Sequence, residues 1–196
     1  TGCLSLDTAT GIGGIPRGRM TEIYGPESAG KSTLCLQVIA EAQKEGGLVA
    51  YIDTEYAFDR EYADKLGVRT EDLFVSQPSA AEDVFSIIEK LIKSKEFSVI
   101  VVDSVAALKP QAEINGEFGD AIMGVMPKLM SQACRVLVEH VSKSNTALIF
   151  VNQIRSNMGM TMGSPETTPG GKALRFYASL RLDIRRIGQI KSGDTV

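Results

Sequence analysis

The chain has 196 residues, of which 43% are hydrophobic and 23% are charged, so it reads as an ordinary globular protein with length for one sizeable core. No apolar run approaches the roughly 20 residues that span a bilayer, and no basic and apolar leader marks the chain for secretion. The three cysteines are odd in number and widely spread, which argues against a disulfide framework or a zinc site and fits a reducing cytosol. We therefore expect a cytoplasmic protein without a membrane partner.

Charge is distributed unevenly along the chain. The net charge is −3, which alone does not indicate a nucleic-acid partner. Residues 155–196 nevertheless carry a net charge of +4, and the rest of the chain −7, because three acidic side chains in that segment are outnumbered by seven basic ones: Arg155, Lys172, Arg175, Arg181, Arg185, Arg186 and Lys191. A basic end on an acidic body permits phosphate contacts, although a solvated surface has the same appearance.

Short apolar segments alternate along the chain with segments of helical periodicity. In chain order the pattern predicts a strand at 20–24, a helix at 31–45, a strand at 48–53, helices at 59–66 and 80–93, a strand at 98–103, a helix at 127–144, and strands at 146–152 and 178–185. Runs that are apolar on both faces, such as residues 99–102, are typical of a covered parallel sheet. The alternation predicts an α/β fold with a mostly parallel central sheet flanked by helices, in which ligands bind beyond the carboxyl ends of the strands.

The strongest motif lies between the first strand and the first helix. Residues 25–32 read GPESAGKS and match G-x-x-x-x-G-K-[ST] in the strand–loop–helix context that this motif requires. Backbone N–H groups between Gly25 and Gly30, with the helix N-terminus, would form a nest for phosphate. Lys31 would reach the β- and γ-phosphates, and the Ser32 hydroxyl would bind Mg²⁺. The motif therefore predicts a site for ATP and Mg²⁺; the alternative is a glycine-rich turn with a surface lysine.

Polar side chains follow three other predicted strands. Asp103 ends a buried strand, where it would hold Mg²⁺ through water and orient Ser32, or would simply cap the following turn. Glu55 lies just past the preceding strand and could orient or deprotonate the attacking water, a role for which Asp53 competes. Gln153 follows the fourth strand and could sense the γ-phosphate, or could be a strand-end amide satisfied by the backbone.

Two stretches without periodicity, residues 113–124 and 154–171, are long for loops in a compact domain, and such loops are usually functional or disordered. They offer glycines, basic residues at their flanks and four methionines: Met123, Met158, Met160 and Met162. Apolar side chains can wedge between bases while basic groups bind phosphate, which would suit sequence-independent binding of single strands. A methionine-rich loop is equally typical of a protein interface.

Four tracts together resemble the bacterial RecA recombinase family. Residues 25–33 read GPESAGKST, residues 101–108 VVDSVAAL, residues 152–155 NQIR and residues 165–179 PETTPGGKALRFYAS, and the resemblance runs over the whole chain. It implies a P-loop NTPase fold of the RecA type, with residues 1–196 forming a single ATPase core domain. It also implies that the N-terminal docking segment and the C-terminal region of family members are missing from this chain.

The resemblance assigns roles at the nucleotide site. Glu55 is then the catalytic carboxylate, acting with Lys31, and Gln153 couples the nucleotide to DNA. Mg²⁺ lies between Ser32 and Asp103. The nucleotide-binding residues are those of the P-loop, the metal-side acid and two positions that contact adenine: Gly25, Pro26, Glu27, Ser28, Ala29, Gly30, Lys31, Ser32, Thr33, Asp103, Asp59 and Tyr62.

Roles at the DNA site follow from the same resemblance. The loops at about 113–124 and 154–171 match the two DNA-binding loops. The backbone of single-stranded DNA is held by Met123, Lys128, Ser131, Arg135, Arg155, Thr167, Thr168, Gly170 and Gly171. Phe176 matches a subunit-interface residue that links neighbouring ATP sites. Three residues depart from the common pattern of the family: Met162 in place of an aromatic residue, Lys172 in place of Asn and Lys128 in place of Arg.

We therefore expect the DNA-dependent ATPase core of a recombinase that acts in homologous recombination and DNA repair. It would bind ATP and Mg²⁺ at subunit interfaces of a homo-oligomeric filament and pair single-stranded with double-stranded DNA. Turnover by this chain alone is expected to be low. The alternatives are a ring-forming, helicase-like motor ATPase and a nucleotide-binding module with little turnover.

Overall fold

The computed structural model describes residues 1–117, 124–156 and 166–188. Its centre is a six-stranded sheet with the order β3-β2-β4-β5-β1-β8, in which every pairing is parallel. The strands are β1 (Arg19–Gly25), β2 (Leu48–Asp53), β3 (Leu73–Ser76), β4 (Phe97–Asp103), β5 (Ala147–Gln153) and β8 (Leu180–Asp183). The predicted α/β fold with a parallel central sheet is thus confirmed.

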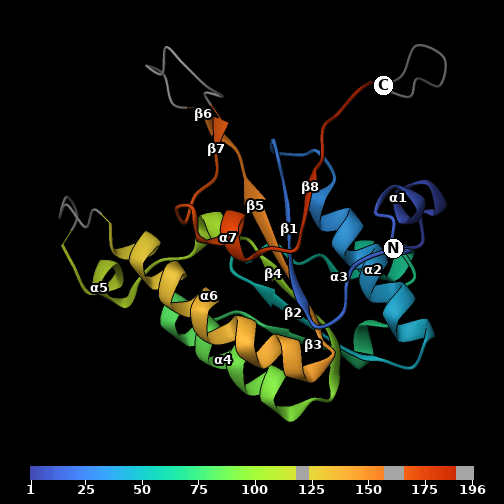
Figure 1. Cartoon of the computed structure of the whole chain (residues 1–196), viewed down its shortest axis with the longest axis horizontal. Helices are drawn as coiled ribbons and strands as arrows, with labels where there is room; N and C mark the ends of the chain where they lie inside the picture. The colour runs from blue at the N-terminus through green and yellow to red at the C-terminus, as the bar shows by residue number, and fades with distance from the viewer. Residues whose placement is uncertain (118–123, 157–165, 189–196) are drawn as a thin grey trace.

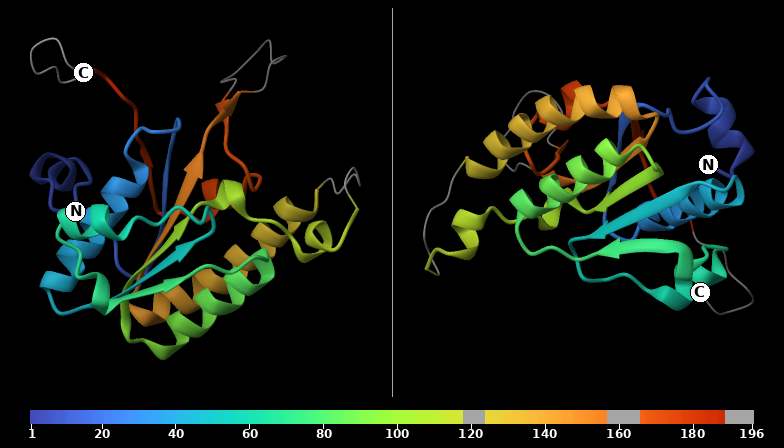
Figure 2. Two further views of the ribbon diagram at one scale, coloured as in Figure 1. Left: turned by 180° about the vertical axis from the view of Figure 1, so that it is seen from behind. Right: turned by 90° about the horizontal axis from the view of Figure 1, so that it is seen from below.

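Helices cover both faces of this sheet (Figures 1 and 2). One face carries α4 (Ala81–Ser94), α6 (Val125–Ser144) and the short α7 (Ala173–Tyr177), and the other carries α2 (Lys31–Lys44) and α3 (Arg60–Lys65). The remaining helices, α1 (Leu4–Ala9) and α5 (Gln111–Ile114), are short, as are the 3₁₀ turns η1 (Thr70–Asp72) and η2 (Val105–Ala107). A two-stranded antiparallel ribbon, β6 (Arg155–Ser156) and β7 (Glu166–Thr167), extends beyond the end of β5 (Figure 1).

Alternate residues of the central strands supply two separate hydrophobic cores. In β4, Ile100 and Val102 pack under α4 and α6, whereas Val99 and Val101 pack under α2. β5 divides in the same way, because successive side chains of a strand point to opposite faces. Burial on both faces explains why these strands read as continuous apolar runs.

The predicted elements agree with the structure within about two residues at most ends, the usual uncertainty of element boundaries. Pro127 lies in the first turn of α6, as predicted, although the helix begins two residues earlier at Val125. Strand β3 was not predicted: it has only four residues, and Phe74 and Val75 are exposed at the sheet edge. Four further elements, α1, α5, α7 and the β6–β7 ribbon, were also not predicted, because each is too short to show a period.

Parallel pairing brings four strand ends to one edge of the sheet. Gly25 is in register with Gln153, and Asp53 is in register with Asp103. The P-loop, which follows β1, therefore lies at the same edge as the polar residues that end β2, β4 and β5.

Candidate functional site

The P-loop occupies residues 25–30, between β1 and α2. A Cβ atom on Gly25 would lie 2.1 Å from the carbonyl oxygen of Ile184, so no side chain fits at this position. Gly30 precedes α2 with φ 98°, in the left-handed region that glycine adopts without strain. With these two glycines, the chain turns directly from the sheet edge into the N-terminus of a 14-residue helix.

Lys31 is the first residue of α2 and is buried. Its Nζ donates hydrogen bonds to the carbonyl oxygens of Pro26 (2.6 Å) and Gly25 (3.1 Å). A buried ammonium group requires such partners, and here the loop itself supplies them. The positive charge is therefore held inside the loop, next to the helix N-terminus, where both attract an anion.

Ser32 and Tyr51 donate hydrogen bonds to the same oxygen of Asp103. Both hydroxyl groups lie 2.6 Å from Oδ2 of the carboxylate. Burial raises the pKa of Asp103, while the two donors oppose that effect. Burial also raises the pKa of Tyr51, so its hydroxyl keeps the proton that it donates.

Glu55 and Asp53 have different surroundings, although they are two residues apart. The buried Asp53 carboxylate accepts hydrogen bonds from the backbone N–H groups of Glu55 (3.2 Å) and Phe58 (3.0 Å) and from Nε2 of Gln77 (2.9 Å). It thus organises the turn after β2. Glu55 is exposed, and its Oε1 accepts hydrogen bonds from Ser104 and from Nε2 of Gln153 (3.2 Å).

Lys31, Ser32, Asp103 and Glu55 line one cavity of about 500 Å³. It is lined by most of the predicted P-loop residues and by three strand-end residues: Glu27, Ser28, Ala29, Gly30, Lys31, Ser32, Thr33, Glu55, Asp103 and Gln153. Gly25 and Pro26 form the base of the loop. No group of three or more His, Cys, Asp or Glu side chains suited to a metal occurs in the described part of the chain.

The two predicted adenine contacts lie beside this cavity rather than in its lining. Tyr62 is 41% exposed, and its hydroxyl is 2.9 Å from Oγ1 of Thr33. The Asp59 carboxylate accepts a hydrogen bond from the backbone N–H of Tyr62 (3.0 Å) and so caps α3. Asp59 therefore has a structural task whether or not it contacts a ligand.

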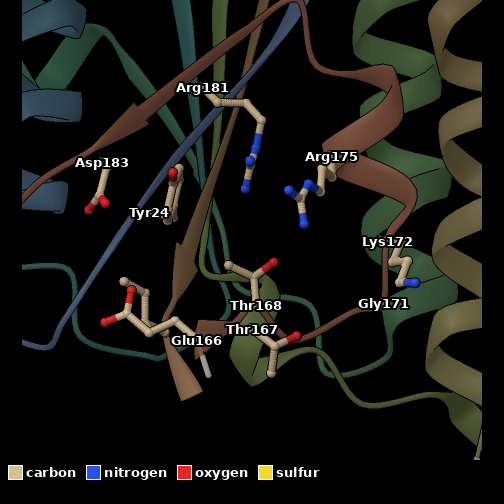
Figure 3. Close-up of a pocket in the computed structure, with 10 residues that line it drawn as sticks. Tyr24, Glu166, Thr167, Thr168, Gly171, Lys172, Arg175, Arg181 and Asp183 are labelled. Atoms are coloured by element: carbon tan, nitrogen blue, oxygen red, sulfur yellow. The ribbon is translucent and has the colours of Figure 1, made fainter. Parts of the chain in front are cut away.

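A second cavity, of about 280 Å³, lies on the other side of β1. The side chains of Arg175 and Arg181 point into it, with Lys172 at its margin, and Thr167 and Thr168 form its opposite wall (Figure 3). The Arg181 guanidinium lies over the ring of Tyr24 at 4.5 Å, a favourable cation–π geometry. The cavity joins the segment after β7 to the basic end of the chain.

Arg181 also belongs to a buried network behind this cavity. Its Nε lies 2.6 Å from Oε2 of Glu22, which is fully buried in β1. Oε1 of Glu22 accepts a hydrogen bond from Nδ2 of Asn152 (3.0 Å), and the same Nδ2 reaches the carbonyl oxygen of Pro169 (3.2 Å). One buried carboxylate thus connects the P-loop strand, the end of β5 and the segment that precedes Gly170.

The predicted DNA contacts lie on several elements. Lys128 and Arg135 are exposed on α6, and the partly buried Ser131 between them donates to the Pro127 carbonyl oxygen (2.9 Å). Arg155 and Thr167 are exposed and paired in the β6–β7 ribbon. Met123 and Met162 lie outside the described residues.

Gly170 and Gly171 have a packing role that the sequence did not indicate. Both have φ near +80°, and added Cβ atoms would lie 2.9 Å from Val105 Cγ1 and 2.9 Å from Pro127 Cβ, respectively. The glycines therefore let the segment after Thr168 lie against α6. Phe176, in α7, is 78% exposed.

Sequence reasoning missed Tyr51, Ser104, Glu22 and Asn152 as parts of the site. Ser104 follows Asp103 directly, and Tyr51 lies in a predicted strand, but neither position showed that its hydroxyl reaches a carboxylate on another strand. The three thiols are unpaired, and Cys35 and Cys134 are buried. No helix in the described ranges is long and apolar enough to cross a membrane.

Comparison with known proteins agrees with the resemblance. The family model for the RecA N-terminal domain matches residues 1–196. Protein RecA 2 of Myxococcus xanthus is 60% identical over 196 residues, which cover 100% of this chain and 55% of that protein. Protein RecA of Syntrophobacter fumaroxidans is 61% identical over 196 residues, with 100% and 57% covered. Protein RecA of Chlorobium chlorochromatii is 60% identical over 194 residues, with 99% and 55% covered.

The chain thus spans little more than half the length of these curated relatives. The match extends over every element that builds the two cavities. From the family model and these identities together, the chain belongs to the RecA family.

Proposed function

We propose that this chain is the ATPase core of a cytoplasmic, DNA-dependent recombinase that acts in homologous recombination and DNA repair. The observation that carries the proposal is the convergence of Lys31, Ser32, Asp103 and Glu55 on one cavity at the carboxyl edge of a parallel sheet. Residues 1–196 would act as a single core domain.

ATP would be bound through its phosphates by the P-loop. The backbone N–H groups at residues 25–33 and the ammonium group of Lys31 would hold them, with Thr33 nearby. Tyr62 would stack on the adenine, with Asp59 beside it. Lys31 would exchange the carbonyl oxygens of Gly25 and Pro26 for phosphate oxygens.

The donor set beside the P-loop fits Mg²⁺, a hard cation that prefers oxygen ligands and keeps several waters. The Ser32 hydroxyl would be a direct ligand, and Oδ1 of Asp103, to which no described residue donates, would hold a metal-bound water. Mg²⁺, when bound, would neutralise phosphate charge. The hydrogen bond between Ser32 and Asp103 would set the direction of the serine oxygen.

Glu55 would orient and deprotonate the water that attacks the γ-phosphate. Its support is the contrast with Asp53, whose carboxylate is buried and engaged by three donors, whereas Glu55 is exposed on the cavity wall. Gln153 would sense the γ-phosphate and transmit that state along β6, because its amide contacts Glu55 while β6 begins two residues later.

Single-stranded DNA would bind across α6, the ribbon and the segment that follows it. Lys128 and Arg135 would contact phosphates, together with Arg155 and the threonines at 167–168, while Ser131 and the backbone near Gly170 and Gly171 complete the path. Met123, in the first predicted DNA-binding loop, would also contact the DNA strand. The bound strand would then be paired with homologous double-stranded DNA.

The family resemblance adds a homo-oligomeric filament in which ATP lies between subunits. The exposed phenyl ring of Phe176 suits an interface position, because such a large apolar surface is otherwise exposed to water. ATP binding would strengthen the grip on DNA, and hydrolysis would relax it.

The proposal is tested with the full-length protein that carries this sequence. ATP hydrolysis is measured with and without single-stranded DNA, and pairing with a homologous duplex is followed in parallel. We expect DNA-stimulated turnover, assembly on single-stranded DNA after ATP is added, and loss of turnover in Glu55→Gln with nucleotide binding retained. A rate of ATP hydrolysis that single-stranded DNA does not change would contradict the proposal. Duplex unwinding without pairing would support a helicase-like motor instead.

A further inference from the structure

We propose that Ser104 is a positioning residue for Glu55, holding one oxygen of its carboxylate and leaving the other oxygen free for the attacking water. The inference rests on the proposed function, because it takes Glu55 as the group that acts on this water. It adds a residue that lies outside the P-loop and outside the predicted site.

The contact itself is asymmetric. The Ser104 hydroxyl donates a short hydrogen bond to Oε1 of Glu55, and Nε2 of Gln153 donates to the same oxygen at 3.2 Å. No described residue donates to Oε2. Ser104 is 1% exposed, whereas Glu55 is exposed on the cavity wall. A buried donor therefore anchors one end of an otherwise mobile, solvent-facing carboxylate.

Thr54, the residue before Glu55, fixes the place of that donor. Its backbone N–H donates to the carbonyl oxygen of Asp103 (2.8 Å), and its Oγ1 donates to the carbonyl oxygen of Ser104 (2.7 Å). The ends of β2 and β4 are thus tied together on both sides of Ser104. A group held in this way needs little reorganisation during a reaction, which is the condition for efficient positioning.

Ser104 and Gln153 differ in how freely they can leave Glu55. Gln153 is only partly buried and lines the nucleotide cavity, so its amide can turn towards a phosphate. Ser104 does not line the nucleotide cavity and is covered by protein. When Gln153 turns away, the Ser104 hydroxyl remains the donor that keeps Glu55 in place.

The experiment measures DNA-dependent ATP hydrolysis by the full-length protein and its Ser104→Ala and Ser104→Cys variants. Alanine is smaller than serine and enters the site without a clash, while cysteine refills the volume with a weak donor. We expect kcat to fall roughly ten- to a hundredfold for Ser104→Ala, the scale of a misplaced catalytic group, and less for Ser104→Cys. The KM for ATP and the affinity for a non-hydrolysable ATP analogue should stay unchanged.

The matched control is Ser79→Ala. It removes a serine hydroxyl that lies 3.1 Å from the hydroxyl of Tyr56, the residue that follows Glu55. It should leave kcat unchanged. A second measurement compares the residual single-turnover rates of Glu55→Gln with and without Ser104→Ala. The two rates should be equal, because the effect of Ser104 passes through the Glu55 carboxylate.

The possible results distinguish a failure of the inference from a failure of the proposed function. Wild-type kcat in Ser104→Ala, with Glu55→Gln inactive, overturns the role of Ser104 and leaves the proposed function standing. A parallel loss of analogue affinity shows a structural role and also overturns the inference. A wild-type protein without DNA-dependent turnover overturns the proposed function and the inference together.

Discussion

The hydroxyl of Ser32 donates a 2.6 Å hydrogen bond to Oδ2 of Asp103, which joins the first turn of α2 to the end of β4 across 71 residues of sequence. Tyr51 donates to the same oxygen from β2. Three separate elements are therefore arranged around one carboxylate before any ligand is added. Such an arrangement lowers the cost of ordering the site when a metal and phosphate bind.

Asp103→Asn should weaken the binding of ATP with Mg²⁺ by roughly ten- to a hundredfold, the usual effect of losing a group that orients a metal ligand. The same change should raise the thermal midpoint of the nucleotide-free chain at pH 7, because it removes a buried charge. Calorimetric titration and thermal unfolding measure the two effects. A variant that binds as tightly as the wild type would exclude Asp103 from the metal side of the site.

The pH dependence of that stability difference has a defined sign. Burial raises the pKa of Asp103 above its ordinary value of 3.8. At a pH between 3.8 and the raised pKa, the folded state therefore keeps a proton that the unfolded state releases. The free energy of unfolding contributed by this group therefore falls as pH rises through the window. The advantage of Asp103→Asn should shrink as pH is lowered through the raised pKa, and a constant advantage would rule out this explanation.

Lys31→Ala should reduce nucleotide affinity by about a hundredfold or more, since it removes at least two charge-assisted contacts that contribute about 1.5–3 kcal/mol each. Titration with a fluorescent ATP analogue measures the change. Lys44→Ala is the control, because Lys44 lies in the last turn of the same helix and forms an ion pair with the partly exposed Glu41, away from the nucleotide cavity. Unchanged affinity in Lys31→Ala would remove the basis of the P-loop assignment.

Gln153→Ala should uncouple DNA binding from nucleotide in the full-length protein. The affinity for single-stranded DNA is measured with and without a non-hydrolysable ATP analogue, and the ratio of the two values should fall towards one. Gln37→Ala serves as the control, because Gln37 lies in α2 and does not line the nucleotide cavity. If the affinity for DNA still depends on nucleotide in Gln153→Ala, Gln153 does not couple the nucleotide site to the DNA site.

Arg181→Ala should lower the free energy of unfolding by about 3 kcal/mol, because it leaves the buried Glu22 carboxylate without its counter-charge. Urea denaturation of this chain measures the loss. Arg185→Ala, which breaks exposed ion pairs with Glu166 and Asp183, should change stability far less. Equal effects of the two substitutions would mean that the buried pair of Arg181 and Glu22 contributes no more to the free energy of unfolding than exposed ion pairs do.

Gly170→Ala and Gly124→Ala separate backbone strain from steric clash. Both glycines have φ near +80°, so each alanine should cost about 1–2 kcal/mol for the left-handed conformation. Only Gly170 would also place its Cβ against Val105 and Met130, which adds roughly 1–3 kcal/mol for overpacking. The difference between the two in urea denaturation measures the clash, and no difference would mean that the segment simply shifts away from α6.

Local sequence patterns predicted much of the candidate site. The spacing of Gly25, Gly30 and Lys31 predicted the P-loop because that loop is a contiguous segment with its own backbone geometry. Apolar runs predicted five strands, and the parallel sheet brought their polar ends to one edge. Asp103, Glu55 and Gln153 could therefore be placed at this edge before their contacts were known.

Other features depended on how the strands were ordered and registered. The sequence did not decide whether Asp53 or Glu55 acts on the attacking water. In the structure, Phe58 and Gln77 donate hydrogen bonds to Asp53. Ser104 and Gln153 donate to Glu55. The pairing of Glu22 with Arg181 spans 159 residues, and the packing of Gly170 against Met130 joins the segment after β7 to α6. A periodic pattern reports which face of an element is buried, whereas a hydrogen bond between side chains on different strands depends on atomic distances that are set when the whole sheet and its covering helices pack together.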